Sequence, residues 1–133
     1  MGDTGIACAL LGLDAAMLDR KRESLGALLE TFVLQELRRQ ASWRREPIGF
    51  FHFRDRDDFE VDVVLEQGQL AVAGVEVKAA ATVGEADLRG LRKLRAAAGK
   101  RFAGGVVLYD GTAAGKLDDR LFAVPIRALW ESA

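Results

Sequence analysis

The strongest constraint on the fold is a set of three short strand-like segments that follow one another closely in the middle of the chain. They are Ile48 to Arg54, Phe59 to Glu66 and Leu70 to Ala79. Two parallel neighbouring strands need a crossover of a dozen or more residues between them, and these connections are far shorter. We therefore expect the three segments to form an antiparallel meander.

Helical patterns flank this meander. Apolar residues recur at helical spacing from Ser24 to Gln40 and again from Gly84 to Gly99. Strands are expected at Phe102 to Tyr109 and Leu121 to Val124, and Pro125 suits the first position of a closing helix through Trp130. The prediction is an α/β fold (α+β with a mixed sheet), in the order helix, three-stranded antiparallel meander, helix, strand, strand, helix.

Composition narrows the class of protein. The chain has 133 residues, half of them hydrophobic and 29% charged, which is typical of one globular domain spanning residues 1–133. Two further short helices are expected at Thr4 to Leu11 and Ala15 to Asp19, and a polar loop at Asp110 to Asp119. The longest stretch without a charged residue has ten residues, too few to span a membrane. The single cysteine, Cys8, excludes an internal disulfide, so we expect a cytoplasmic location.

The net charge of −1 argues mildly against a dedicated nucleic-acid binder, but the charges are segregated. Six acidic residues lie close together: Asp55, Asp57, Asp58, Glu60, Asp62 and Glu66. Six basic residues follow later: Arg89, Arg92, Lys93, Arg95, Lys100 and Arg101. An acidic cluster beside a basic helix is the charge pattern of a metal-and-phosphate site, and equally of two solvated surfaces.

The residues that suggest chemistry lie on the second and third expected strands. Because residues two apart share a face of a strand, Glu60 points with Asp62, and Glu76 points with Lys78. The other residues expected on these faces are apolar: Val64, Leu70 and Val72. The opposite face is also apolar: Val61, Val63, Leu65, Ala71, Ala73, Val75 and Val77. We therefore expect both faces to be covered, with the charged groups at one end opening on a cleft.

The turn between these strands decides whether the two acids meet. A three-residue loop at residues 67–69 would set Asp62 opposite Gly74 and diagonal to Glu76, within side-chain reach. A two-residue turn would need a bulge, for example at Gly74, to bring both acids to one face.

Two carboxylates and a strand carbonyl form a hard oxygen site that suits Mg²⁺ or Mn²⁺. Asp62 and Glu76 are therefore the candidate ligands, and Lys78 is the candidate group that orients an attacking water or stabilises charge on a phosphate. Together these are the groups that metal-assisted phosphodiester hydrolysis needs. Acid-x-Lys is also common on ordinary solvated strands, so simple ion pairing of this cluster remains an alternative.

Longer blocks of sequence sharpen the interpretation. They are Asp3-Thr4-Gly5-Ile6, Leu10-Leu11-Gly12-Leu13, Gly26 to Val33 with Glu36-Leu37, Arg54 before Glu60-Val61-Asp62-Val63-Val64, Val75-Glu76-Val77-Lys78, and Ala123-Val124-Pro125-Ile126 with Leu129-Trp130. Together they resemble the carboxy-terminal, nuclease-like domain of unknown function found in prokaryotic AAA-type ATPases, and the wider PD-(D/E)xK, restriction-endonuclease-like nuclease superfamily. The resemblance covers nearly the whole chain.

The resemblance implies an α-β-β-β-α-β core with Asp62, Glu76 and Lys78 at the active-site positions. It implies that Glu30, on the first long helix, completes a site for Mg²⁺ or Mn²⁺, and that the activity is that of a prokaryotic DNA endonuclease. Val61 stands where the superfamily motif has proline. Related chains carry an ATPase module in cis, but no Gly-x-x-x-x-Gly-Lys-Ser/Thr motif is present, so no ATP binding is expected. The chain is interpreted as a fragment or a stand-alone relative of such an ATPase.

Further residues are candidates for supporting the acids or contacting DNA: Glu60, Arg54, Arg89, Arg92 and Lys93. The basic ones would bind DNA only if they flank the cleft, and would otherwise form a solvated helix face. Two alternatives to a nuclease stay open. One is a catalytically silent domain that binds DNA or docks on and regulates an AAA-type ATPase; the other is a structural module that forms a homo-oligomer.

Overall fold

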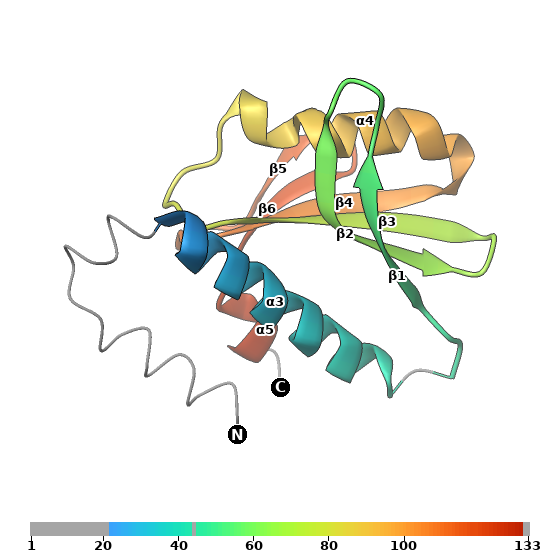
Figure 1. Ribbon diagram of the computed structural model, residues 1–133, viewed down its shortest axis with the longest axis horizontal. Helices are drawn as coiled ribbons and strands as arrows, with labels where there is room; N and C mark the ends of the chain where they lie inside the picture. Colours follow the sequence, from blue (N-terminus) through green and yellow to red (C-terminus); the bar gives the residue numbers. More distant parts are fainter. Residues whose placement is uncertain (1–21, 44, 132–133) are drawn as a thin grey trace.

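A six-stranded mixed sheet forms the centre of the computed structural model, with helix α3 on one face and α4 on the other (Figure 1). The structure describes residues 22–43 and 45–131, so the two short helices expected before residue 20 lie outside the described residues. The elements are α3 (Arg22–Ala41), β1 (Gly49–Arg54), β2 (Glu60–Gln67), β3 (Ala71–Lys78), η1 (Glu85–Leu88), α4 (Arg89–Ala98), η2 (Gly99–Arg101), β4 (Phe102–Tyr109), β5 (Gly115–Asp118), β6 (Leu121–Pro125) and α5 (Ala128–Glu131).

The order of strands across the sheet is β1-β2-β3-β4-β6-β5. The first three strands form the predicted antiparallel meander. The segment containing α4 then crosses one face and returns the chain parallel to β3, and β4 in turn pairs parallel with β6. The predicted mixed α/β fold with helices on both faces of the sheet is therefore confirmed at this level.

Two expectations near the C-terminus are wrong. The predicted loop at 110–119 contains β5, an edge strand whose exposed residues lack strand alternation and which forms by antiparallel pairing with β6. Pro125 is the buried last residue of β6, paired with Tyr109, and does not begin a helix. Ile126 N–H donates to the Tyr109 carbonyl oxygen at 2.8 Å, and the closing helix begins only at Ala128.

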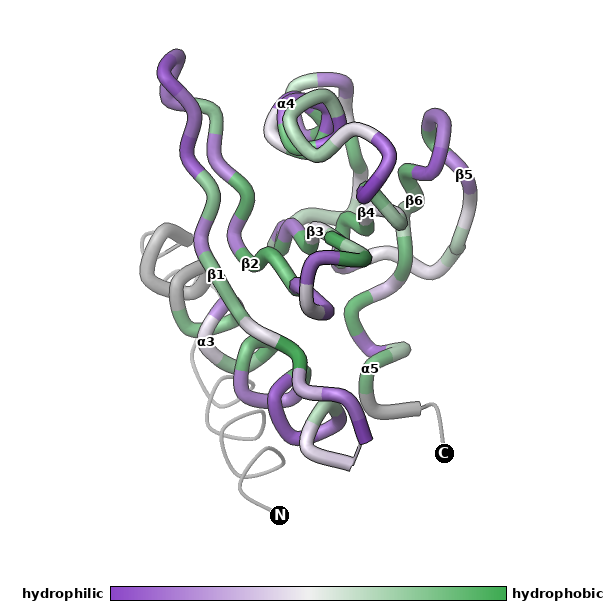
Figure 2. Tube along the Cα trace, turned by 90° about the vertical axis from the view of Figure 1, so that its right-hand side faces the viewer, coloured by the Kyte–Doolittle hydropathy of each residue, from purple (hydrophilic) through white to green (hydrophobic). Residues whose placement is uncertain are grey.

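The expected cover on both faces of the sheet is present. On the α4 side, Leu91 and Leu94 belong to a buried cluster with Val61 and Val107. On the α3 side, Val33 packs with strand residues in a second cluster: Val63, Val75 and Leu108. Along the strands hydrophobic and hydrophilic residues alternate, whereas the tip of the β1–β2 hairpin is hydrophilic throughout (Figure 2). Among the described residues, no helix is long and apolar enough to cross a membrane.

The turn between β2 and β3 has three residues, as the first of the two expected turns did, but it lies one residue later. Gln67 pairs with Ala71, which leaves residues 68–70 in the loop, and Gly68 adopts a φ of 57°. Val64 therefore pairs with Gly74, and the same register continued sets Asp62 opposite Glu76. The expectation that Asp62 lies opposite Gly74 is therefore wrong, because the later turn moves the pairing of β2 by two residues.

A β-bulge interrupts β2 beside the acidic residues. Phe51 pairs with Val64 and Phe53 with Val61, so Asp62 and Val63 together oppose the single residue His52. The bulge breaks the alternation expected along β2, because the strand gains one residue relative to its neighbour. Val61 and Val64 both join the α4-side cluster, while Val63 joins the α3-side cluster.

Candidate functional site

Asp62 and Glu76 meet at the end of the β2–β3 ladder. The backbone N–H of Asp62 donates to Oε1 of Glu76 at 3.1 Å, and the backbone N–H of Val77 donates to Oδ2 of Asp62 at 2.8 Å. The backbone pairing of the two strands ends one step earlier, at Val63 with Val75. The two carboxyl groups thus accept N–H groups that would otherwise pair with carbonyl oxygens across the strands.

Glu30 reaches the same place from α3. Glu30 is exposed overall, but partial burial of its carboxyl group, hydrogen bonding to the Asp62 side chain and the charges of Asp62 and Glu60 raise its pKa to about 7. Burial and the neighbouring charge of Asp62 raise the pKa of Glu76 to about 9; the Asp62 N–H opposes this rise, while Glu30 adds to it. Burial disfavours the charged carboxylates, and the neighbouring negative charges repel one another, so both acids hold their protons more tightly than free carboxyl groups do.

The chemistry of these donors fits a hard divalent cation, because three carboxyl groups from two strands and a helix supply only oxygen atoms. Their arrangement, however, contains hydrogen bonds between the acids. Within the described ranges, no group of three or more His, Cys, Asp or Glu side chains is placed to hold a metal ion. The three groups therefore fit a metal by type, whereas their present positions are not those of ligands around one ion.

Lys78, two residues beyond Glu76, forms an ion pair with Asp87 of η1. Gly84 N–H donates to the same Asp87 oxygen at 2.7 Å, and Asp87 N–H donates to the Gly84 carbonyl at 3.0 Å. Burial alone would raise the pKa of Asp87, but the bonds from Lys78 and Gly84 outweigh it and lower the pKa below its ordinary value.

Sequence reasoning missed Asp87. A signal was available in the Gly84-x-x-Asp87 spacing, because an acid three residues into a helical turn commonly bonds back to the first N–H of that turn.

Most of the other candidate residues are held by partners of their own. Arg54 bonds to Glu60, which lowers the pKa of that carboxyl group. The remaining pairs link α4 to neighbouring segments: Arg92 with Glu85 and Asp118, and Lys93 with Asp55 and Asp57. Arg89 is exposed at the start of α4. The structure therefore joins Glu60 to Arg54 beside the acids, while Arg92 and Lys93 connect α4 with β5 and with the β1–β2 hairpin.

Close contact between α4 and β2 positions this end of the sheet. A Cβ atom added to Gly90 would lie 2.0 Å from the carbonyl oxygen of Glu60. Only glycine allows the two backbones to come this close, so the start of α4 is set directly against the strand that carries Asp62.

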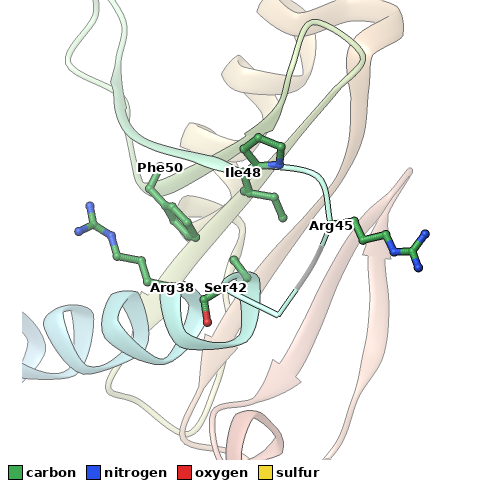
Figure 3. Close-up of a pocket in the computed structure, with 7 residues that line it drawn as sticks. Arg38, Ser42, Arg45, Ile48 and Phe50 are labelled. Atoms are coloured by element: carbon green, nitrogen blue, oxygen red, sulfur yellow. The ribbon is translucent and has the colours of Figure 1, made fainter.

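A separate hollow of about 400 Å³ lies between the end of α3 and the start of β1 (Figure 3). Its lining residues are Arg38, Ala41, Ser42, Arg45, Pro47, Ile48 and Phe50. The side chains of Arg38 and Arg45 extend away from one another on its two sides, so they do not converge on one ligand (Figure 3). None of the clustered acids lines this hollow.

No curated protein and no solved structure matches the chain. One family does match: it is described as Domain of unknown function (DUF4143), a domain usually found with AAA ATPases, and the match covers residues 25–129. The matched range includes Glu30, Asp62, Glu76, Lys78 and Asp87. It confirms the predicted likeness to an ATPase-associated domain of unknown function, and the chain belongs to the DUF4143 family.

Proposed function

We propose that this domain is a nuclease-like domain of the PD-(D/E)xK type that hydrolyses DNA phosphodiesters with the help of Mg²⁺ or Mn²⁺. The observation that supports the proposal is the gathering of Asp62, Glu76 and Glu30 at one end of the sheet, where Asp62 bonds to Glu76 and its charge acts on Glu30. Crowding carboxyl groups at a partly buried place costs free energy, so their gathering calls for a cation or another balancing partner.

In this proposal Asp62 and Glu76, assisted by Glu30, hold the divalent ion. The ion, when bound, supplies a Lewis acid for the phosphate and lowers the pKa of a bound water. The carboxyl groups must release their protons to bind it, so binding is weaker at low pH. The ammonium group of Lys78, on the same strand as Glu76, orients the attacking water and stabilises negative charge on the phosphate.

Contact with DNA would involve Arg54, Arg89, Arg92 and Lys93. Three of these four already pair with carboxylates of the same chain: Arg54, Arg92 and Lys93. They would have to exchange those partners for phosphates, which weakens binding and makes it strongly dependent on salt. Together with the net charge of −1, this favours transient contact with DNA.

A second function is a catalytically silent domain that docks on an AAA-type ATPase or binds DNA without cutting it. Two observations favour it: the absence of a metal-holding arrangement among the described side chains, and the ion pair that engages Lys78 with Asp87. The usual occurrence of the family with AAA ATPases is compatible with either function.

Metal binding is the first test. Calorimetric titration of Mn²⁺ into the wild-type chain should give a binding isotherm, and Asp62→Ala should weaken the affinity at least about tenfold. Asp57→Ala removes an exposed acid from the hairpin tip and serves as the matched control. Equal affinities for wild type and Asp62→Ala would contradict the proposed metal site.

Hydrolysis is the second test. Supercoiled plasmid and single-stranded DNA are incubated with Mn²⁺ and either wild type or Lys78→Ala. The nuclease proposal expects cleavage by wild type and much slower, still measurable cleavage by Lys78→Ala. Cleavage that is equal in both samples would indicate a contaminating enzyme, whereas metal binding without cleavage would favour the silent domain.

A further inference from the structure

The ammonium group of Lys78 is bound by a residue that does not belong to the cluster of Asp62, Glu76 and Glu30. Its described hydrogen bond and ion pair go to Asp87, and neither Asp62 nor Glu76 shares them. A lysine has four flexible methylene groups and many rotamers, so a charged partner that is itself fixed decides where the ammonium group lies.

Asp87 is such a fixed partner. Its backbone and its carboxylate both bond to Gly84, which closes the η1 turn around it. The next residue, Leu88, is 2% exposed and belongs to the α4-side core. The position of the Asp87 carboxylate is thus set by the backbone of the turn and by packing of the neighbouring residue.

We propose that Asp87 is the positioning residue for Lys78: its fixed carboxylate holds the ammonium group in one place, two residues along the strand from Glu76. The catalytic consequence of this role rests on the proposed nuclease function. Asp87 acts through Lys78, since its described bonds go to Lys78 and Gly84 and to none of the clustered acids.

Kinetics test the catalytic consequence. Asp87→Asn keeps an oxygen for Gly84 N–H but removes the charge, so kcat for Mn²⁺-dependent DNA cleavage should fall about 10- to 100-fold while KM changes less than about twofold. Glu85→Gln is the matched control, because Glu85 lies on the same turn, is exposed and pairs with Arg92; it should leave kcat unchanged. In a Lys78→Ala background, Asp87→Asn should cause no further loss. An unchanged kcat in Asp87→Asn, or additive losses in the double variant, would overturn the proposal.

A spectroscopic test does not depend on cleavage. An ammonium group held in an ion pair exchanges its protons slowly, so the Nζ group of Lys78 should give a ¹H–¹⁵N cross-peak in the cold, identified by its loss in Lys78→Arg. The peak should persist in Glu85→Gln and vanish in Asp87→Asn. Its absence from wild type, or its survival in Asp87→Asn, overturns the positioning role whatever the enzyme assays give. If the peak depends on Asp87 but wild type neither binds Mn²⁺ nor cleaves DNA, the nuclease function fails while the hold of Asp87 on Lys78 stands.

Discussion

The backbone N–H of Asp62 is hydrogen-bonded to the side chain of Glu76 across the end of the β2–β3 ladder, at 3.1 Å. This relationship depends on two features of the sheet. The register of the hairpin sets the two residues opposite one another, and the bulge in β2 changes the course of the strand at Asp62. The acids therefore lie where ladder bonds give way to side-chain bonds.

Stability should fall as the pH rises. The pKa values of Glu30 and Glu76, about 7 and about 9, lie above the ordinary 4.5, so the folded chain keeps protons that the unfolded chain has released. Their contribution to stability is complete below about pH 4.5 and is lost as the pH passes through 7 and 9. We expect the free energy of unfolding in urea to decrease by on the order of a few kcal/mol from about pH 5 to about pH 9, mostly through the more buried Glu76.

Glu76→Gln serves as the control for this pH dependence. Glutamine keeps the oxygen that accepts the Asp62 N–H but carries no charge, so the slope of stability against pH should flatten. Glu36, Asp87 and Asp118 have lowered pKa values and lose their contributions only as the pH falls below about 4.5, so they do not mask the effect. A wild-type profile that is level over this range would contradict the raised pKa values of Glu30 and Glu76.

Mn²⁺ should stabilise the protein more at about pH 8 than at about pH 5.5. The ion competes with the protons of Glu30 and Glu76, and fewer protons are bound at the higher pH. Thermal unfolding with and without Mn²⁺ measures this difference, and binding to the folded state alone raises the Tm. The shift should disappear in Asp62→Ala; an equal shift at both pH values would point to binding at some other group.

Asp62→Asn, without metal, should leave stability unchanged or raise it by about 1 kcal/mol at about pH 8. The substitution removes repulsion with Glu76 and Glu30, while the asparagine oxygen still accepts the Val77 N–H. Urea denaturation beside Asp57→Asn, the exposed control, measures the change. A loss of several kcal/mol would favour the interpretation in which Asp62 is an ion-paired structural residue.

Gly90→Ala should destabilise the fold by about 3 kcal/mol, although alanine normally favours a helix interior by about 1 kcal/mol over glycine. The added methyl group would lie 2.0 Å from the Glu60 carbonyl oxygen, so α4 must move away from β2. Gly115→Ala is the control, since nothing lies within 4 Å of its added Cβ. If the two variants unfold at the same urea concentration, the close contact between α4 and β2 is not a constraint on the fold.

Short-range patterns were sufficient to predict the framework. The brief connections after Arg54 and Glu66 exclude crossover helices, and apolar residues on both strand faces require cover on both sides. The same patterns predicted that Asp62 and Glu76 lie close together, because strand alternation and a three-residue turn bring both side chains to one place. The likeness to an ATPase-associated domain of unknown function could also be recognised from sequence, because the blocks around Glu30, Asp62 and Glu76 carry it.

Only the tertiary structure decided how the candidate site residues are positioned. The turn lies one residue later than expected, the bulge pairs His52 with two residues of β2, and β5 exists because β6 offers it an edge. Asp87 meets Lys78 only because η1 folds back beside β3. Periodicity along a chain determines which residues share a face, but the energies that select a register, a bulge or an ion-pair partner arise between segments that only folding brings into contact.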